Sequence, residues 1–378
     1  MANPSLQIGN SNWAIKEDNL LGYSTAGTRF VPQPITMTRA SAGTRVNSSG
    51  LVETVELLGS DLTSPLNFLS TWLEASVDSK TYNTFTVGGS GRGMYFMLPE
   101  NKTLKINVSG VTGSVELRYR TTTGGAGTVL GDFDTDLYLT TTNATTNIYL
   151  RATGAGTVSV TDISVKESTK NNLARVDYDG TASSLLVEPE RTNLLTYSED
   201  FSNAVWSEVS GGSASNPVLT NDYAISPDGT ENATRCLFDM GSGTTTSDYS
   251  RLRHLNLTAT TPVISLYIKS NNANTYQLNF SYGGDATFLV DAKPNEWTRV
   301  DKSTTASGSF DYRLELRGTY TSDDIADVLI WGAQAEEGSY PTSYIPTDGS
   351  TVTRVQDQYS KTGISNLINS EEGVLFVE

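Results

Sequence analysis

The sequence has almost no cysteine or histidine. In 378 residues there is one of each, Cys236 and His254. A single cysteine cannot form an internal disulfide, and the usual zinc sites need several His or Cys ligands. A Ser-His-Asp triad would have to use His254, but no Gly-x-Ser-x-Gly motif occurs in the chain. We therefore expect His254 to be a structural or surface residue.

Charged residues are also scarce, and they are unbalanced. They make up 18% of the chain, with 26 Lys and Arg against 42 Asp and Glu, a net charge of −16. An acidic surface repels a phosphate backbone, so we expect no nucleic-acid partner. The chain lacks the run of about 18 apolar residues that a membrane helix needs. It opens Met1-Ala2-Asn3-Pro4, without the basic start and apolar core of a signal peptide. We therefore expect that the protein is made in a cytoplasm and does not insert into a membrane.

The chain is rich in Thr, Ser, Gly and Asn, and it has 18 Tyr, 11 Phe and 5 Trp. Disordered chains do not carry so many aromatic side chains. Between residues 61 and 168, apolar and polar residues alternate with period two, as in Leu104, Ile106 and Val108. The alternation returns beyond residue 196, for example in Tyr276 and Leu278, with glycine-rich turns between such segments. This pattern predicts an all-β protein with two antiparallel jelly-roll-type β-sandwiches on an irregular N-terminal attachment region.

Five regions are expected along the chain. They are an N-terminal attachment or collar region (1–60), a first sandwich (61–168), a linker (169–195), a second sandwich (196–347) and a C-terminal extension (348–378). The sandwiches look like diverged copies of one module, because each opens with an aromatic pair, Phe68 and Trp72 or Phe201 and Trp206. The stretch 371–378 reads as a first strand that leads into a further domain or docks on a neighbour, because a lone edge strand is not stable.

Three segments resemble a pattern of tailed-phage virion proteins. They read TRASAGTRVNSSGLVE (38–53), ARVDYDG followed by LLVEPERTNLLTYSEDFSNAVW (174–206), and WGAQAEEGSYPTSYIPT (331–347). Together they resemble fibre or adhesin proteins that carry carbohydrate-binding-module-like jelly rolls. In such proteins the first two segments often follow closely on each other. The resemblance therefore implies that residues 61–168 are an insertion, and that residues 38–57 and 170–192 pack together at its base.

The resemblance also implies a function. We expect a structural component of a tailed-phage virion, a fibre-like or decorating appendage exposed on the particle and involved in attachment to host-surface glycans. The expected partners are further copies in a homotrimer, other virion proteins through residues 1–57, and host glycans. One alternative is a head or neck decoration or cement protein without a receptor role. The other is a polysaccharide-degrading tail enzyme.

Calcium is the one metal that the resemblance suggests. In carbohydrate-module-like jelly rolls an Asp near the last strand often helps to hold a structural calcium ion. The matching positions are Asp162 and Asp327, with Asp200 as a further candidate from the opening strand. A solvated acid is the alternative at each position. No other cofactor is expected.

Aromatic residues are the candidates for glycan contact, because the C–H face of a sugar packs favourably on an aromatic ring. We select Trp72, Trp206, Trp297 and Tyr282, each with a core position as the alternative. Catalysis is not expected. The acids that could form a hydrolytic pair, such as Asp132 and Asp134, lie in turn-like segments, where solvated carboxyls make poor general acids.

Overall fold

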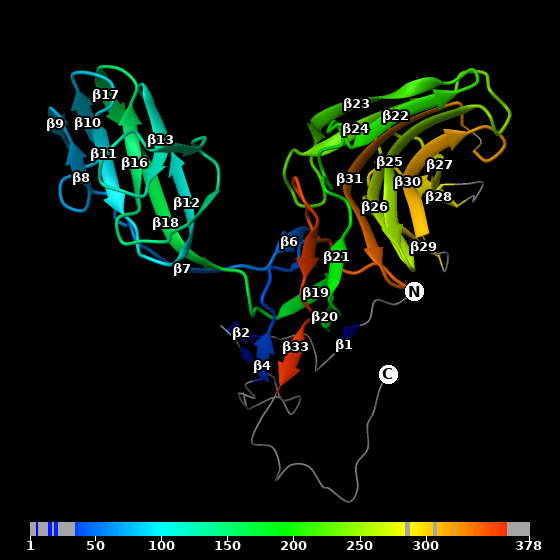
Figure 1. The fold of residues 1–378 in the computed structure, drawn as a ribbon, viewed down its shortest axis with the longest axis horizontal. Coiled ribbons are helices and arrows are strands. Elements are labelled where there is room, and N and C mark those ends of the chain that lie inside the picture. Colours follow the sequence, from blue (N-terminus) through cyan, green and yellow to red (C-terminus); the bar gives the residue numbers. More distant parts are fainter. Residues whose placement is uncertain are drawn as a thin grey trace, which may run out of the picture. The chain divides into compact units, whose positions relative to one another are not determined.

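The computed structural model describes residues 5–6, 14–16, 19–21, 35–283, 288–304, 308–321 and 323–360. Over these residues the chain forms strands and no helix, so the all-β prediction is confirmed. No helix that could cross a membrane occurs in these ranges. The chain divides into two compact units (Figure 1). Unit 1 comprises Met1–Val55 and Lys170–Glu378, and unit 2 comprises Glu56–Thr169.

Unit 2 is a sandwich of antiparallel sheets. The five-stranded sheet has the order β14-β13-β16-β11-β8 and the four-stranded sheet the order β15-β12-β18-β7, with a small sheet β17-β10-β9 beside them. The five-stranded sheet contains β8 (Leu73–Ala75), β11 (Gly93–Met97), β13 (Val115–Arg120), β14 (Thr128–Gly131) and β16 (Asn147–Ala152). The other strands are β7 (Leu57–Asp61), β9 (Ser79–Lys80), β10 (Thr84–Val87), β12 (Thr103–Ser109), β15 (Leu137–Thr140), β17 (Gly156–Ser159) and β18 (Asp162–Thr169).

Period-two alternation explains why these segments pack as a sandwich. Along β12, Leu104, Ile106 and Val108 are buried in the core, whereas Lys105 and Asn107 lie on the other face and are only partly buried. Successive side chains of a strand point to opposite faces, so one face of each sheet supplies the core.

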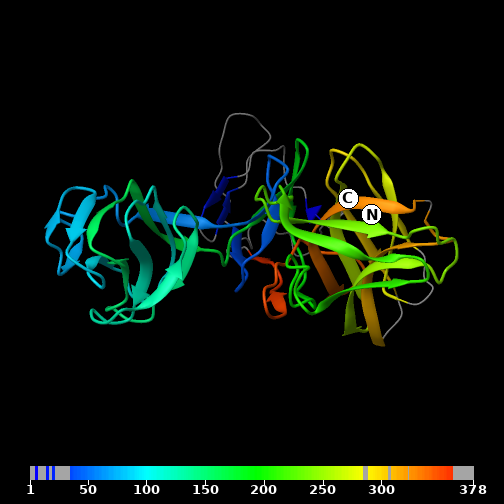
Figure 2. The ribbon, with the colours of Figure 1, turned by 90° about the horizontal axis from the view of Figure 1, so that it is seen from above.

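The larger sandwich of unit 1 has two five-stranded sheets, with the orders β22-β25-β30-β27-β28 and β23-β24-β31-β26-β29. Their strands are β22 (Trp206–Gly211), β23 (Ser215–Ala224), β24 (Ala233–Asp239), β25 (Tyr249–Ala259), β26 (Pro262–Ser270), β27 (Tyr276–Ser281), β28 (Leu289–Ala292), β29 (Thr298–Ser303), β30 (Gly308–Arg317) and β31 (Ile325–Glu337). Residues of both sheets, among them Leu252 and Ile330, form one hydrophobic core. Figure 2 shows the layers of each sandwich from a second direction.

The two sandwiches share one strand order. When the strands of β14-β13-β16-β11-β8 are counted in chain order, the sheet reads 4-3-5-2-1, and β28-β27-β30-β25-β22 reads the same. The second sheets also agree, since β15-β12-β18-β7 and β29-β26-β31-β24 both read 3-2-4-1, with β23 added at the edge of the latter. This is the arrangement that two copies of one module would have.

The rest of unit 1 is a base of short strands below its sandwich (Figure 1). Its sheets are β1-β20-β19, β2-β3-β4-β33, β5-β6 and β21-β32. The strands are β1 (Ser5–Leu6), β2 (Ala14–Lys16), β3 (Asn19–Leu21), β4 (Ile35–Thr38), β5 (Thr44–Val46), β6 (Val52–Thr54), β19 (Arg175–Asp179), β20 (Ala182–Leu186), β21 (Arg191–Asn193), β32 (Val352–Arg354) and β33 (Gln358–Ser360).

The base differs from the sequence prediction in two places. Residues 35–54, expected to be largely irregular, form β4, β5 and β6. Residues 352–360, expected to be an extension, return into the base, where β32 pairs with β21 and β33 pairs with β4. These strands are only three or four residues long, so they carry little periodic signal, and β32 and β33 pair with partners remote in sequence. The stretch 371–378, interpreted as a further strand, lies outside the described residues.

Residues on either side of unit 2 are hydrogen-bonded to each other in the base. The Arg39 amide donates to Asn172 Oδ1 (2.9 Å), and the Asn172 amide donates to the Arg39 carbonyl (2.9 Å). The Val46 amide donates to Asp177 Oδ1 (2.6 Å). The segments around residues 39–46 and 172–177 are therefore in contact, although more than a hundred residues separate them in the chain.

Unit 2 should be removable from the chain. Its ends are neighbours, because Leu57 and Thr169 are paired in the antiparallel ladder of β7 and β18, where paired Cα atoms lie roughly 5 Å apart. Replacing residues 57–169 by a short Gly-Ser linker is expected to leave unit 1 folded. Calorimetry should show that one transition disappears and the other moves by less than about 4 °C. Loss of both transitions would contradict the division into two units.

Candidate functional site

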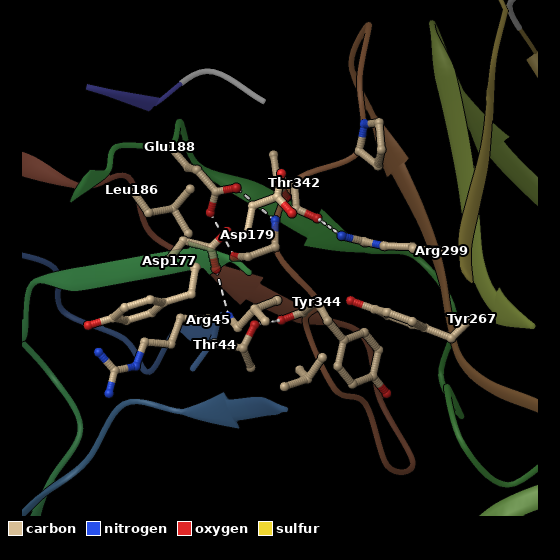
Figure 3. Close-up of a pocket in the computed structure, with 15 residues that line it drawn as sticks. Thr44, Arg45, Asp177, Asp179, Leu186, Glu188, Tyr267, Arg299, Thr342 and Tyr344 are labelled. Atoms are coloured by element: carbon tan, nitrogen blue, oxygen red, sulfur yellow. Dashed lines mark hydrogen bonds between the residues drawn. The ribbon is translucent and has the colours of Figure 1, made fainter. Parts of the chain in front are cut away.

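Unit 1 contains a pocket of about 290 Å³ where the base meets its sandwich (Figure 3). The base contributes Asp177 of β19 and Glu188, which follows β20. The sandwich contributes Tyr267 of β26 and Arg299 of β29, and Tyr344 comes from the stretch after β31. Thr44 and Val46 of β5 line it as well, so the pocket is built from segments far apart in the chain.

Asp177 is the most distinctive polar group of this pocket. Its Oδ1 accepts the Val46 amide, and among the described residues no hydrogen bond to Oδ2 is recorded. Burial raises the pKa of Asp177, and the nearby charge of Glu188 raises it further, against the lowering effect of the Val46 amide. The side chain can therefore accept hydrogen bonds from a ligand and, when protonated, donate one.

The aromatic wall of the pocket is tightly packed. The ring of Trp331 lies 5.4 Å from that of Tyr267 and 4.6 Å from that of Tyr344. Gly332 (φ +64°) lets the rings of Tyr267 and Tyr344 lie close to the backbone, because a Cβ there would lie 3.2 Å from the first ring and 3.4 Å from the second. The Arg299 guanidinium donates to the Thr342 carbonyl (2.7 Å), which fixes the cation at the rim. The pocket is therefore largely preformed.

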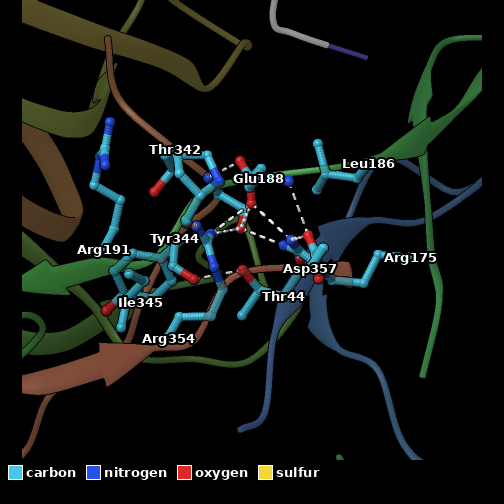
Figure 4. A network of polar contacts seen from close by, with 12 residues as sticks. Thr44, Arg175, Leu186, Glu188, Arg191, Thr342, Tyr344, Ile345, Arg354 and Asp357 are labelled. Carbon is cyan, nitrogen blue, oxygen red and sulfur yellow. Dashed lines mark hydrogen bonds and ion pairs between the residues drawn. The ribbon is translucent and has the colours of Figure 1, made fainter. Parts of the chain in front are cut away.

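Glu188 joins this pocket to a group of buried ion pairs, which we call the arginine–carboxylate cluster (Figure 4). Its members are Arg39, Arg175, Glu188, Arg354 and Asp357, whose side chains are at most 5% exposed. Glu188 Oε2 lies 2.8 Å from Arg175 Nη2 and 2.5 Å from Arg354 Nη1. Asp357 pairs with Arg39 (2.8 Å) and with Arg175. The cluster therefore ties together three distant segments of the chain.

The ionised form of Glu188 is stabilised in this cluster. Burial alone would raise the pKa of Glu188, but the charges of Arg175 and Arg354 and the hydrogen bonds from Ser343 outweigh it and hold the pKa below its usual value. Isolated buried charges are costly, so each cluster member depends on its partners.

Asp177 and Glu188 have pKa values displaced in opposite directions, a pattern also found in acid–base pairs of enzymes. Glu188, however, has no free capacity to act as a nucleophile or base. Its Oε1 accepts the Ser343 amide (2.7 Å), and its Oε2 accepts the Ser343 hydroxyl (2.7 Å) in addition to the two arginines. The geometry therefore favours a binding role for the pocket.

Acid should destabilise unit 1 through Glu188. Because its pKa is lower in the folded state, the unfolded chain binds the proton more tightly, and the stabilisation is present above the unfolded value of 4.5 and lost as the pH falls below it. We expect the free energy of unfolding to fall by up to about 1.4 kcal/mol per pH unit from this group. Denaturant titrations between pH 3 and pH 6 would measure it, and Glu188→Gln should flatten the slope. An equally steep slope in that variant would contradict the assignment.

Two of the four aromatic residues proposed for glycan contact are core residues, and the prediction for them is wrong. Trp72 is 3% exposed and Trp206 4% exposed. The ring of Trp72 lies 5.3 Å from that of Phe68, and the ring of Trp206 lies 5.0 Å from that of Phe201. Each aromatic pair closes its own sandwich core, so neither tryptophan offers a face to a sugar.

The other two aromatic candidates are partly exposed. The Trp297 indole NH donates to the Ile225 carbonyl (3.2 Å), and Lys269 Nζ lies 4.9 Å from its ring centroid. Trp297 packs in the same hydrophobic cluster as the pocket residue Tyr344. Tyr282 packs against the core of the unit 1 sandwich. Their role in glycan contact stays a prediction.

The carboxylate of Asp327, one of the calcium candidates, is paired with a cation, and its role as a calcium ligand stays a prediction. Oδ1 and Oδ2 each accept a hydrogen bond from the Arg235 guanidinium at 2.8 Å. Asp200 Oδ1 accepts the amide and the hydroxyl of Ser202 in its own turn, and Asp162 is exposed at the start of β18. Within the part of the chain that the structure describes, no three His, Cys, Asp or Glu side chains gather as a metal site.

His254 is partly buried beside the core. Its ring lies 5.4 Å from that of Trp206, and burial lowers its pKa. Its Nδ1 lies 3.2 Å from the Leu255 carbonyl oxygen. These contacts fit the structural role that the sequence predicted.

No protein-family model and no curated protein matches the sequence. Among solved structures, the chain is similar to a family 11 carbohydrate-binding module from Clostridium thermocellum (11% identity, 41% of this chain and 99% of that chain, TM-score 0.28). It is also similar to the tandem CBM22 domain of Xyn10C from Paenibacillus barcinonensis (12%, 80% and 100%, TM-score 0.26). A third is the tandem CBM51 modules of Sp3GH98 from Streptococcus pneumoniae SP3-BS71 (11%, 80% and 100%, TM-score 0.24). None of the three is a phage protein.

Proposed function

We propose that this chain is a non-catalytic, glycan-binding component of a tailed-phage virion, a fibre-like or decorating appendage that attaches to the host surface. The observation that carries the glycan part is the pocket around Asp177. It combines a carboxylate oxygen without a recorded partner, a guanidinium at the rim and the rings of Tyr267 and Tyr344.

These groups match the chemistry of a sugar. Sugar hydroxyls donate to carboxylates and accept from guanidinium groups, and the C–H face of a sugar ring packs on an aromatic ring. The volume of about 290 Å³ is at the small end for ligand pockets, roughly 300 Å³ upward. Such a pocket suits a terminal sugar unit rather than the middle of a long chain.

The virion part of the proposal is supported by the three sequence segments that resemble phage fibre and adhesin proteins. On this view the protein is made in the host cytoplasm, assembles as a homotrimer and joins other virion proteins through residues 1–57. A cryo-EM map of the particle tests it, because the map gives copy number and attachment point together. Absence from the particle would overturn this part.

Glycan binding is tested on an array probed with the purified chain and with Asp177→Asn. We expect the wild type to retain one class of terminal sugar, and the variant to bind it roughly tenfold more weakly, the effect of losing one charged hydrogen bond. Asp162→Asn, which removes an exposed carboxylate of unit 2, is the matched control and should bind normally. Equal binding by Asp177→Asn would remove the pocket from the proposal, and release of shortened glycans would show an enzyme.

The head or neck cement role predicts a different result. A cement protein would occur in the particle at shell sites, and the purified chain would bind no glycan on the array. Deletion of either sandwich would then leave adsorption to the host unchanged.

A further inference from the structure

The sheet β22-β25-β30-β27-β28 of the unit 1 sandwich bears arginines on its outer face. Along β25, Leu252 points into the core, so its neighbours Arg251 and Arg253 point outward. Along β30, Leu314 points into the core, and Arg313 lies on the outer face. This face also carries Tyr249 and Arg317.

The register places like charges opposite each other on this face. Arg253 is the cross-strand neighbour of Arg313, whereas Arg251 is the neighbour of Glu315. Like charges directly opposite each other in an antiparallel pair are destabilising. The Arg253–Arg313 pair therefore costs folding stability, and a bound anion would relieve it.

Acidic residues neutralise only part of this charge. Glu315 pairs with Arg251 (2.5 Å) and lies 3.7 Å from Arg317. Asp311 pairs with Arg313 (2.5 Å). Among the described residues, no carboxylate is paired with Arg253, and its buried Nε has no hydrogen-bond partner.

The acids beside the central strands do not change this balance. Asp291 lies on the edge strand β28, where Gln277 Nε2 donates to it over 3.4 Å. The central strands β25 and β30 thus carry four arginines against two carboxylates on this face.

Unit 2 also carries arginines and tyrosines on the outer face of its five-stranded sheet. Arg118 of β13 is opposite Tyr149 of β16, which is opposite Tyr95 of β11. The Arg120 guanidinium lies 4.7 Å from the ring centroid of Tyr95 and 4.0 Å from that of Tyr149. Arg151 lies on the same face.

Glu116 is the acid that forms ion pairs with arginines of this second face. Glu116 lies 2.7 Å from Arg118 and 3.8 Å from Arg151. Arg120 Nη2 is buried without a hydrogen-bond partner. The two sheets have the same strand order, so equivalent faces of two modules carry the same chemistry.

We infer that these two arginine–tyrosine faces bind an acidic polysaccharide, a glycan chain that bears carboxylate or sulfate groups. The residues of these faces that are partly exposed are Tyr249, Arg253, Arg313 and Arg317 in unit 1 and Tyr95, Arg118 and Arg151 in unit 2. Arg251, Arg120 and Tyr149 are buried beneath them and hold them in place. Guanidinium groups bind carboxylate and sulfate through two parallel hydrogen bonds. The partly exposed rings of Tyr249 and Tyr95 supply apolar surface for the sugar rings between the charges.

The overall charge of −16 does not prevent this binding. At physiological ionic strength, exposed charges more than about 8 Å apart are largely screened, so the local arginines determine the field at each face. This inference does not depend on the pocket around Asp177.

The test compares two charge-matched double variants. Arg118→Gln with Arg253→Gln removes one arginine from each face. Lys166→Gln with Arg235→Gln removes one cation from the other main sheet of each sandwich. Affinity electrophoresis in gels containing polygalacturonate, dextran sulfate or neutral dextran measures binding at two salt concentrations. Near-ultraviolet circular dichroism of each variant checks that it is folded.

We expect the wild type to be retarded by both acidic polymers and not by neutral dextran, less so at high salt. The face variant should bind roughly tenfold more weakly, and the control variant like the wild type. Equal losses in both variants, or equal retardation by neutral dextran, would overturn the inference. So would equally tight binding of single-stranded DNA, since it would show recognition of charge alone. Retarded migration caused by self-association, detected by sedimentation without polymer, would assign the faces to copies of this chain instead.

Discussion

Replacing Glu188 by glutamine is expected to lower the free energy of unfolding of unit 1 by about 3–5 kcal/mol, the usual effect of removing one partner from a buried ion pair. Glutamine keeps the shape of the side chain but leaves Arg175 and Arg354 with less compensation for their burial. Denaturant titration of the purified variant measures the change.

Glu190→Gln is the control for this experiment, because Glu190 is exposed only two residues away. Its free energy of unfolding should change by less than about 0.5 kcal/mol. The transition of unit 2 should be the same in both variants. A loss below about 1 kcal/mol for Glu188→Gln would show that the cluster contributes little to stability.

Replacing Trp206 by alanine is expected to cost about 3–5 kcal/mol, as for other large aromatic residues in cores. The side chain contacts the rings of Phe201 and Tyr312, and its indole NH donates to the Tyr197 carbonyl (3.0 Å). We expect this variant to lose glycan binding only under conditions in which its sandwich is unfolded. Calorimetry together with binding measured well below the unfolding temperature separates these effects.

Trp297→Ala provides the comparison, because Trp297 is partly exposed. We expect a cost nearer 1 kcal/mol. Normal stability of Trp206→Ala combined with lost binding would return Trp206 to the list of glycan contacts and contradict its core role.

The all-β architecture was predictable because it depends on local pattern. Leu104, Ile106 and Val108 alternate with polar residues, and all three are buried in the structure. Which aromatic residues are buried was not predictable in the same way. Trp72 and Trp297 look alike in the sequence, and only the packing of the sheets separates a core residue from a partly exposed one.

The pocket and the arginine–carboxylate cluster left no local signal. Asp177, Tyr267 and Arg299 lie in three separate strands, and Arg39 pairs with a residue 318 positions away. The segment around Asp177 stood out only through its resemblance to phage proteins. Contacts of this range depend on strand order, which the periodicity of a single segment does not encode.

The position of Asp357 in the cluster affects the order in which the chain folds during its synthesis. Residues 56–169 leave the ribosome together, so unit 2 can fold while the rest of the protein is still being made. The base cannot close completely then, because Asp357, the ion-pair partner of Arg39 and the second carboxylate beside Arg175, is translated much later. A chain cut short before residue 357 would keep a folded unit 2 on an open base that proteases can reach.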